Sequence, residues 1–599
     1  MKKTKGFSGK FLKTFLLLLI PILVVTTIYI FKAKAQTGDV ETISTYVTVG
    51  NSAPTFNTGP EESVPTSDPL VFTTSTDTNP TAIGTTITFN ANATDPNGEP
   101  YYFIVCSTNA IVKGTSGNAP SCAAGATPYC ATPVSSQASG ADASCSYQTV
   151  PGNAWSNPWY AFVCDNNASS ECTMSQGTGG SGSPFFVNHP PTFSAIAIDP
   201  SSATVNPGAT VTWTATASDT DDPLPLNPSD PDLLDNPDAT SRVRLLVCKS
   251  DTPPTNGECA GGPSQRWCWS PDKGIAANPS CSYSVPKPNA AGSNDAYAFV
   301  IDNFNLLASN TPRNAHFTVN NVAPTVTDVS LHGGSNEITL AESTTQPVAI
   351  TATVSDDNGC STLSNVKAYV YRSGIGYSGC DATATPNGNY CYPELSCSTT
   401  NCSGRTATYN CTANMQYYAD PTDTGSKFAS ENWLATVKAT DGGSLTGNAQ
   451  TTTGVEVKKL IAFSISPNNI TYGNVGAGAN MSLTVALTTR ATGNVGINQT
   501  HHVDSTKPNM CTNYPSCTGG TPISITKQQY SMTSGTAYGS GTSLSTSPAT
   551  VLLKIKKPIS STAQQKNTYW GIEVPSGTVA GSYQGQNIIT AVMSATSDW

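Results

Sequence analysis

One short stretch of sequence recurs, and it constrains the fold more than any other feature of the chain. Residues 84–95 read GTTITFNANATD and residues 208–219 read GATVTWTATASD, an alignment without a gap. A looser third copy covers residues 346–356. In each copy apolar residues alternate with Thr, Asn or Ser, which is the period of a β-strand with one buried face. The repetition predicts an all-β chain built from several similar units.

Linkers that contain proline mark the junctions between these units. They read NSAPTF at 51–56, VNHPPTF at 187–193 and VNNVAPTV at 319–326. The prolines are 191 − 54 = 137 and 324 − 191 = 133 residues apart. Such a period indicates tandem domains, each with its own core. We expect antiparallel β-sandwich repeats at 51–190, 191–323 and 324–458, the third rich in cysteine, and a divergent C-terminal β-sandwich at 459–599.

The N-terminus has the pattern of an export signal. Lysines precede an uncharged run from Thr14 to Phe31, and residues 33–35 read AKA, a small-residue cleavage site. The run is long for a signal peptide and just long enough to cross a bilayer. Residues 1–35 are therefore predicted to be a cleaved signal peptide or an N-terminal transmembrane anchor helix, followed by a polar leader at 36–50. Either alternative predicts an extracellular protein, secreted or membrane-anchored, whose contact with the membrane is this segment.

The 18 cysteines fit an oxidising compartment. Each predicted domain holds an even number of them, so each is expected to close its own disulfides. The second domain lacks counterparts of both Cys164 and Cys172, which predicts that these two pair in the first domain. The other expected bridges in the first, second and fourth domains join neighbours in the sequence: Cys106–Cys122, Cys130–Cys145, Cys248–Cys259, Cys268–Cys281 and Cys511–Cys517.

The third domain has six cysteines, for which fifteen pairings are possible. The most local pair, Cys397–Cys402, is favoured, and the pairing of the other four stays open: Cys360, Cys380, Cys391 and Cys411.

Six aspartates at predicted strand ends form the candidate functional site. If both strands finish at the same pole of a sandwich, each repeat brings two carboxylates together, and oxygen ligands of this kind suit Ca²⁺. The alternative is that Asp and Asn only form turns, as in the sequence DPNG at 95–98. The positions of Asp165 and Asp302 relative to the aromatic residues before them predict that these two point away from the core. The candidate calcium ligands are Asp95, Asp165, Asp219, Asp302, Asp356 and Asp441.

Composition and motifs exclude other classes of function. The net charge of −10 gives no basic footprint, so no nucleic-acid partner is expected. The sequence holds five histidines but no HExxH zinc motif and no GxSxG elbow, so no enzymatic activity is expected. The pair His501-His502 is interpreted as lying in an exposed loop.

The residues around these aspartates also resemble a known class of protein. The stretch ATDPNGE at 93–99, the Asp at the end of a late strand and the linker VNHPPTF look like cadherin-like and other immunoglobulin-like repeats of bacterial surface proteins. The resemblance covers residues 51–460 and implies sandwiches that act as stalks or adhesins, some with calcium at their junctions. The chain departs from it at the junctions, where Asn188 and Asn320-Asn321 stand in place of the acidic residues that cadherins use.

These observations favour an exported structural or adhesive rod of disulfide-linked repeats, with an unidentified surface ligand that is a protein or a glycan. One alternative is a carbohydrate-binding accessory protein, because exposed aromatic side chains stack on sugar rings. Another is a secreted hydrolase whose catalytic domain would be residues 459–599. The aromatic candidates for sugar contact are Trp155, Trp159, Trp267, Trp269, Tyr417 and Tyr418.

Overall fold

The computed structural model describes residues 44–599 with internal gaps at 66–71, 78, 116, 132–135, 222–241, 272, 275–277 and 384. The predicted signal or anchor segment at 1–35 lies outside the described residues. Within the described part, no helix has the length and apolar character needed to cross a bilayer.

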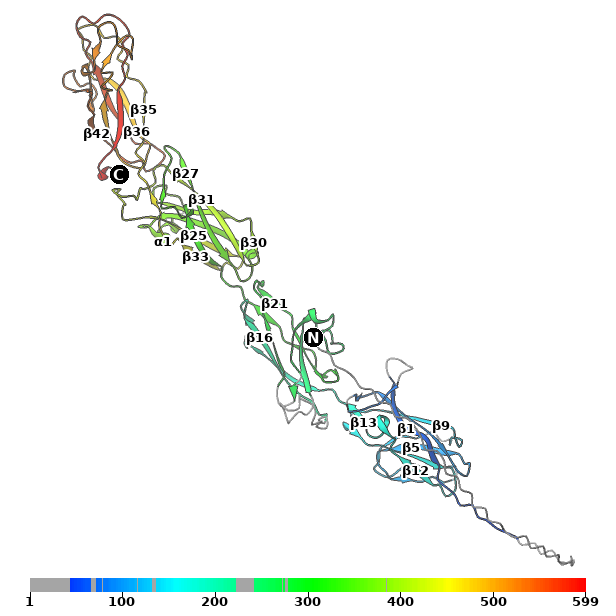
Figure 1. Cartoon of the computed structure of the whole chain (residues 1–599). Coiled ribbons are helices and arrows are strands. Elements are labelled where there is room, and N and C mark those ends of the chain that lie inside the picture. Colours follow the sequence, from blue (N-terminus) through cyan, green and yellow to red (C-terminus); the bar gives the residue numbers. More distant parts are fainter. Residues whose placement is uncertain are drawn as a thin grey trace, which may run out of the picture.

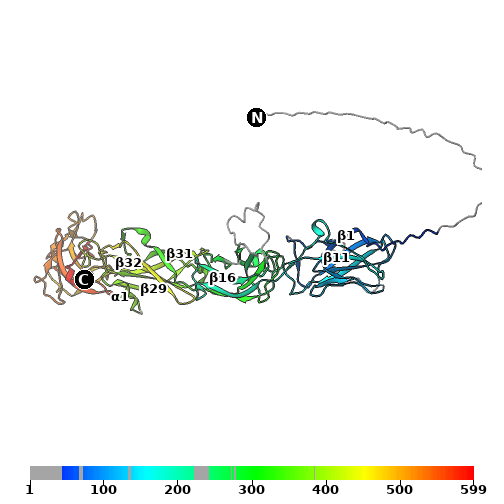
Figure 2. The same ribbon diagram turned by 90° about the horizontal axis from the view of Figure 1, so that it is seen from below.

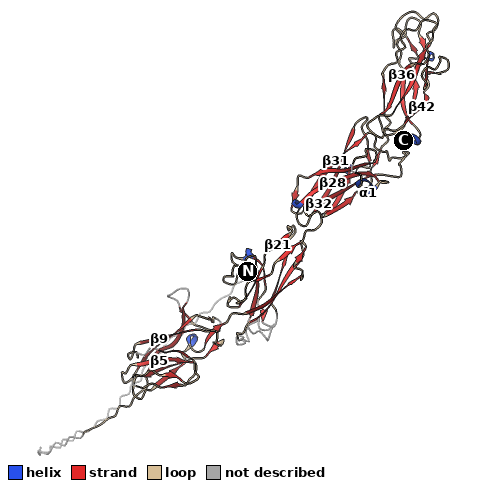
Figure 3. Cartoon of the chain, turned by 180° about the vertical axis from the view of Figure 1, so that it is seen from behind, coloured by secondary structure: helices blue, strands red, loops and turns tan. Residues whose placement is uncertain are grey.

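Four β-rich units follow one another in chain order and form an elongated molecule (Figures 1 and 2). Strands dominate every unit, and the described residues contain one short α-helix, α1 (Gly376–Asp381) (Figure 3). The prediction of an all-β fold of tandem antiparallel sandwiches is confirmed. We refer to these bodies as units 1 to 4, from the N-terminal side.

Units 1, 2 and 3 share a first sheet whose central strand is the recurring sequence stretch. That strand pairs antiparallel with the strand that follows the linker on one side and with a later strand on the other. The three sheets have the strand orders β1 (Thr55–Pro65)–β4 (Thr86–Thr94)–β9 (Asp142–Gln148), β14 (Thr192–Asp199)–β16 (Thr210–Ser218)–β20 (Ser280–Ser284), and β25 (Thr325–Leu331)–β27 (Thr345–Ser355)–β31 (Thr406–Gln416).

The second sheet is repeated as well. It has the orders β8 (Pro128–Ala131)–β5 (Tyr101–Cys106)–β11 (Tyr160–Asp165)–β12 (Cys172–Ser175), β18 (Arg266–Trp269)–β17 (Arg242–Cys248)–β22 (Tyr297–Asp302)–β23 (Arg313–Asn314), and β29 (Cys391–Ser398)–β28 (Leu363–Arg372)–β32 (Trp433–Asp441)–β33 (Thr446–Gln450). In unit 3 the two sheets join, because β29 pairs with β31 as well as with β28.

Shorter strands complete these units. Each unit has one parallel pair near its C-terminal end: β3 (Thr81–Ala82) with β13 (Phe185–Asn188), β15 (Thr204–Val205) with β24 (Phe317–Val319), and β26 (Glu337–Ile338) with β34 (Glu456–Val457). The remaining strands are β2 (Phe72–Thr73), β6 (Ile111–Val112), β7 (Ser121–Cys122), β10 (Ser156–Asn157), β19 (Lys273–Gly274), β21 (Gly292–Asn294) and β30 (Cys402–Ser403).

Unit 4 is also a sandwich, with a different strand order. One sheet runs β35 (Phe463–Ser466)–β36 (Val485–Ala491)–β43 (Gln565–Ile572)–β40 (Gln528–Ser531)–β41 (Thr542–Ser543). The other runs β42 (Ala549–Ile555)–β37 (Ile497–His502)–β44 (Ile588–Met593), and β38 (Asn509–Met510) pairs with β39 (Ile523–Ser524).

The apolar side of each recurring strand faces the core of its sandwich, as the alternation predicts. In β4, Ile87, Phe89 and Ala93 are fully buried, while Asn90 between them is exposed. In β16, Trp213 is fully buried, and its indole nitrogen donates to the carbonyl of Ala315 at 2.9 Å. The side chains of the two sheets therefore form one core per unit.

Disulfides connect the two layers of units 1, 2 and 3 at equivalent positions. The six bridges predicted for units 1, 2 and 4 all form. Two of these bridges have counterparts in both units 1 and 2. Cys106–Cys122 corresponds to Cys248–Cys259, while Cys130–Cys145 joins β8 to β9 and Cys268–Cys281 joins β18 to β20.

The expected Cys397–Cys402 bridge in unit 3 is wrong. Cys397 lies directly opposite Cys411 in the β29–β31 pairing and bonds to it, because adjacent strands bring these Cα atoms to 4.3 Å. This bridge is the counterpart of the layer-spanning bridges of units 1 and 2. Cys402 bonds instead to Cys360, and Cys380 to Cys391.

Candidate functional site

The paired carboxylates come together at the pole where each unit follows its linker. One aspartate ends or follows the recurring strand of the first sheet, and the other ends a central strand of the second sheet. In unit 1, carboxylate oxygens of Asp95, Glu99 and Asp165 all lie within 4.8 Å of one another. In units 2 and 3 the pairs are close enough to interact, since Asp219 helps to raise the pKa of Asp302 and Asp441 helps to raise that of Asp356.

Asp165 and Asp302 do not point away from the core, so that prediction is wrong. Both are buried, with 1% and 4% of their surfaces exposed. Asp165 shares the inner face of its strand with Ala161 and Val163 of the main core of unit 1, and Asp302 shares the inner face of its strand with residues of the core of unit 2. Phe162 lies on the other face, where it packs with cysteines in a second, smaller cluster. The aromatic residue therefore marks the outer face of this strand.

Backbone amides of the following turn bind the carboxylates. Asp95 accepts from the amide of Asn97 at 2.7 Å, and Asp356 accepts from the amide of Asn358 at 2.8 Å. The turn-forming role that the sequence leaves open as an alternative is therefore present at these positions.

In units 1, 2 and 3, the linker supplies a further donor to the late aspartate. The carboxylates that accept are Asp165, Asp302 and Asp441, through Oδ2 in each case. The donors are the side-chain amides of Asn51 at 2.8 Å, Asn188 at 2.6 Å and Asn321 at 2.8 Å.

The residue after each linker asparagine makes a second contact. Its backbone amide donates to the side chain two positions after the early aspartate: Ser52 to Asn97 at 2.9 Å, His189 to Asp221 at 2.6 Å and Val322 to Asn358 at 2.7 Å. We call the pair of contacts the junction clasp. It fixes the incoming linker to both sheets of the unit that follows.

These asparagines are not among the residues predicted from the sequence to form the site. Asn188 and Asn321 enter there only as replacements for the acidic residues of cadherin junctions. The available signal was their position, because Asn51, Asn188 and Asn321 each stand three residues before the linker proline that begins the next repeat.

The clasps differ in what surrounds them. In unit 1 the third carboxylate comes from Glu99, and the buried oxygens Asp95 Oδ2 and Glu99 Oε2 have no hydrogen-bond partner among the residues that the structure describes. Hard oxygen atoms left without a donor in a cluster of three carboxylates fit a divalent cation such as Ca²⁺. Within the described ranges, this is the one cluster of three or more potential metal ligands.

At the junction of units 2 and 3 the neighbouring groups are cationic. Asp357 pairs with Lys287 of unit 2 at 2.7 Å and with Arg405 at 2.9 Å. The hydrogen bond from Lys287 is the main cause that lowers the pKa of Asp357. Asn358 also donates to the carbonyl oxygens of Asn289 and Asn320, both at 2.9 Å, so this turn contacts unit 2 directly.

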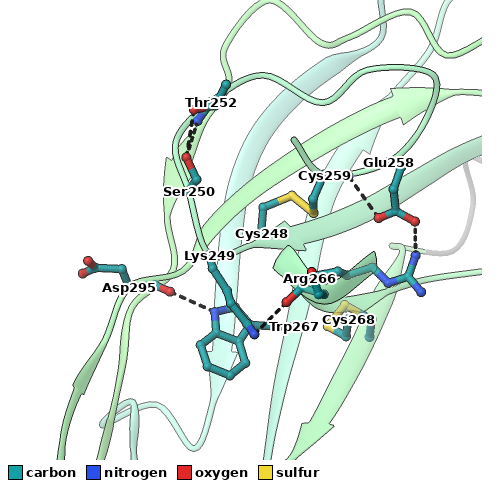
Figure 4. The surroundings of a disulfide bond; sticks show 12 residues. Cys248, Lys249, Ser250, Thr252, Glu258, Cys259, Arg266, Trp267, Cys268 and Asp295 are labelled. Carbon is teal, nitrogen blue, oxygen red and sulfur yellow. Dashed lines mark hydrogen bonds and ion pairs between the residues drawn. A yellow bond between two sulfur atoms is a disulfide. The ribbon is translucent and has the colours of Figure 1, made fainter. Parts of the chain in front are cut away.

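The aromatic candidates for sugar contact are mostly covered. Trp159 is fully buried, and Trp155 packs against Phe304 of unit 2 with ring centroids 5.9 Å apart. Trp267 donates its indole hydrogen to the carbonyl of Asp295 at 2.8 Å beside the Cys248–Cys259 bridge (Figure 4). Tyr417 and Tyr418 are buried as well.

Trp269 is the exception among these six aromatic residues, because 47% of its surface is exposed. The guanidinium groups of Arg244 and Arg266 lie 4.4 and 4.6 Å from its ring centroid. The ring therefore has cationic neighbours and does not form an open stacking platform.

His501 and His502 do not lie in an exposed loop, so that interpretation is wrong. They belong to strand β37, and His501 is fully buried, stacked on Trp570 with ring centroids 5.2 Å apart. Burial lowers the pKa of His501 to about 4, so the ring is neutral at physiological pH.

Comparison with known proteins gives no family assignment. No protein-family model and no curated protein matches the chain. Extracellular cadherin domains 3–6 of protocadherin gamma B2 are 10% identical over 71% of this chain and 84% of theirs, with a TM-score of 0.24. The fibronectin(III)-like modules of Clostridium thermocellum CbhA are 13% identical over 40% of this chain and 87% of theirs, with a TM-score of 0.18. These are tandem β-sandwich proteins, and such low scores carry no information about function.

The clasp predicts a specific effect of removing a linker asparagine. Asn321→Ala leaves Asp441 Oδ2 buried without the donor that Asn321 supplies, which should cost about 1–3 kcal/mol. We expect faster amide hydrogen exchange in the turn at 441–445, measured by mass spectrometry on the full chain. Asn320→Ala is the matched control, because that side chain makes an exposed bond to Asn206. Equal exchange in the two variants would contradict the clasp.

Unit 2 should lose stability as the pH rises through the range in which Asp302 ionises. Burial raises the pKa of Asp302 to about 6, although Asn188 and two backbone amides donate to it. The unfolded value is about 3.9, so between about pH 4 and 6 the folded chain binds more protons and the free energy of unfolding falls as pH rises. Asp302→Asn should flatten this slope and stabilise unit 2 at pH 7 by at most about 2–3 kcal/mol.

Urea unfolding at several pH values measures this effect. Asp251→Asn, an exposed site in the same unit, is the control. A slope between pH 4 and 6 that is the same in Asp302→Asn and in the unsubstituted chain would show that Asp302 does not ionise in this window.

Proposed function

We propose that the protein is an extracellular structural rod that holds its C-terminal unit 4 away from the surface to which its N-terminal side is attached. Nine disulfides among the described residues fit an oxidising location outside the cytoplasm. The observation that carries the proposal is the repeated junction clasp, which ties the incoming linker to both sheets of units 1, 2 and 3.

A clasped linker makes a junction stiff. Flexible linkers are rich in Gly and Ser and leave their backbone solvated. Here, instead, Asn188 is 97% buried and bonded to a buried carboxylate, and Trp155 packs across the junction against Phe304. Units 1 and 2 are therefore held in one orientation, and the asparagine–aspartate contact recurs at the next junction.

Unit 4 offers a large cavity. A cavity of about 910 Å³ opens there and is lined by Tyr472, Met510, Val579 and Tyr583, among others. Strand β43 begins at Gln565 and ends at Ile572, which lines the cavity. The cavity supports a binding or adhesive role for unit 4, with a surface protein or glycan as the ligand.

Small-angle X-ray scattering of the full chain tests the rod. A compact protein of this length would have a radius of gyration of about 25 Å. We expect a much larger value, and a broader distribution of interatomic distances when Asn188 and Asn321 are both replaced by Ala. The double variant Asn206→Ala/Asn320→Ala alters only an exposed pair and serves as the control. A radius of gyration near the compact value would refute the rod.

We also propose that the Asp95–Glu99–Asp165 cluster of unit 1 binds Ca²⁺. The support is the pair of buried carboxylate oxygens without hydrogen-bond partners in a group that carries three acidic side chains. A bound divalent cation would offset the repulsion between these carboxylates. Units 2 and 3 have no counterpart of Glu99 within their described residues and satisfy their carboxylates with hydrogen bonds.

Calorimetric titration of the chelator-treated full chain with CaCl₂ measures this binding. The expected dissociation constant lies in the range of extracellular modules, about 10⁻⁴–10⁻³ M. Glu99→Gln should weaken binding at least about tenfold, while Glu61→Gln, an exposed change on the same unit, should leave it unaltered. Absence of binding at millimolar calcium would exclude the site and would leave the rod proposal intact.

A further inference from the structure

A buried lysine lies where units 3 and 4 meet. Lys557 follows strand β42 of unit 4, and its side chain is 4% exposed. Its Nζ atom lies 2.6 Å from Asn389 Oδ1 and 3.0 Å from Asp420 Oδ1, and both of these residues belong to unit 3. Burying an ammonium group is costly, so its surroundings carry information about what the group does.

The carboxamide of Asn389 is held in one orientation against this amine. Its Nδ2 atom donates to Asn387 Oδ1 at 3.1 Å and to the carbonyl of Ile559 at 2.7 Å, which leaves Oδ1 facing Lys557. The backbone carbonyl of Asn389 accepts from the amide of Asp420 at 2.8 Å. The side chain is 9% exposed, so bulk water has little access to its carbonyl carbon.

Asp420 is placed to move a proton. One carboxylate oxygen contacts Lys557, and the other lies 3.2 Å from Arg372 Nε. Burial lowers the pKa of Lys557, although the attraction of Asp420 opposes this shift. Loss of a proton from Nζ therefore costs less than it would in water, and Asp420 is the adjacent acceptor.

We propose that Lys557 and Asn389 react to form an isopeptide bond that covalently joins unit 4 to unit 3. Asp420 accepts a proton from Nζ, and the neutral amine attacks Cγ of Asn389 to give a tetrahedral intermediate. Asp420 passes this proton to Nδ2 and takes a second proton from Nζ, and the Cγ–Nδ2 bond breaks to release ammonia. The second proton moves from Asp420 to the ammonia, which leaves as ammonium. The product is a secondary amide between Nζ and Cγ, and no oxidant or other reactant is required.

Two features of the site favour this product. Holding an amine against a carbonyl group converts a slow reaction between two molecules into an intramolecular one. The reaction also removes the buried positive charge of Lys557. The positive charges of Arg372 and Lys427, which both act on Lys557, remain near the negative charges of Asp420 and Glu431. The bond would add a covalent link at the one junction that lacks a clasp of the kind found in units 1 to 3.

The proposed bond rests on the proposed rod function, because it would strengthen the rod. The test of the bond, however, does not depend on whether the protein is a rod. Intact mass spectrometry of the reduced full chain should show a deficit of one ammonia, and a peptide map should contain a branched peptide that joins residues 389 and 557. Unlinked peptides with unmodified Lys557 and Asn389 in the folded chain would overturn the bond, whatever the scattering data show for the rod.

Variants separate this bond from other ways of losing ammonia. Cyclisation of Asn389 to a succinimide gives the same mass but no branched peptide, and it would persist in Lys557→Met. We expect the deficit to vanish in Lys557→Met and to form at least about a hundredfold more slowly in Asp420→Asn, since general acid–base catalysis contributes about 10²–10⁴-fold. Lys458→Met, an exposed lysine in the linker before unit 4, is the control. If either variant fails to fold, the peptide map of the unsubstituted chain still decides.

Discussion

Buried carboxylates at the unit poles set the geometry of the rod. A buried charge is tolerated only when it is hydrogen-bonded or paired, and an unsatisfied one costs several kcal/mol. Asp165, Asp302 and Asp441 meet part of this need from their own turns, and the linker asparagine supplies the rest. The sandwich therefore cannot complete its own pole without the segment that leads into it. A local need for hydrogen bonds becomes a constraint on how consecutive units are joined.

The free energies of the individual contacts show which of them contribute most to the stability of a junction. A hydrogen bond to a buried charged group contributes about 1.5–3 kcal/mol, whereas an exposed ion pair contributes about 0–1 kcal/mol. Lys287 and Asp357, which bridge units 2 and 3, are about one-third exposed, so their pairing adds little stability. Asn321 and Asn358 at the same junction act on buried groups or on backbone amides that need partners. The clasp, rather than the salt bridge, holds this junction.

The sequence predicts where the strands lie better than it predicts which side chains of each strand face the core. Alternation in β4 and β16 shows which side chains face the core, because one face of the first sheet is open to solvent. In β11, which ends at Asp165, every residue after Tyr160 is buried, because disulfide-bonded segments pack on the outer face of the second sheet. Alternation then carries no information about direction, which is why Asp165 was placed wrongly. Cysteine pairing followed the repeats in units 1 and 2, and comparison of Cys411 with Cys145 and Cys281 could have extended it to unit 3.

The linker asparagines were missed for a different reason. Asn188 and Asp302 are 114 residues apart, and neither residue type by itself distinguishes a turn, a metal ligand and a hydrogen-bonded pair. Only the fold shows that the two sheets end at the same pole and that the linker passes between them. At the last junction unit 4 contributes its own amide instead. Asn494 is fully buried, donates to the carbonyls of Ala419 and Lys458, and accepts from the amide of Leu460. An asparagine side chain thus fixes the linker at every junction, because an amide satisfies backbone groups and carboxylates alike without adding a charge to a buried site.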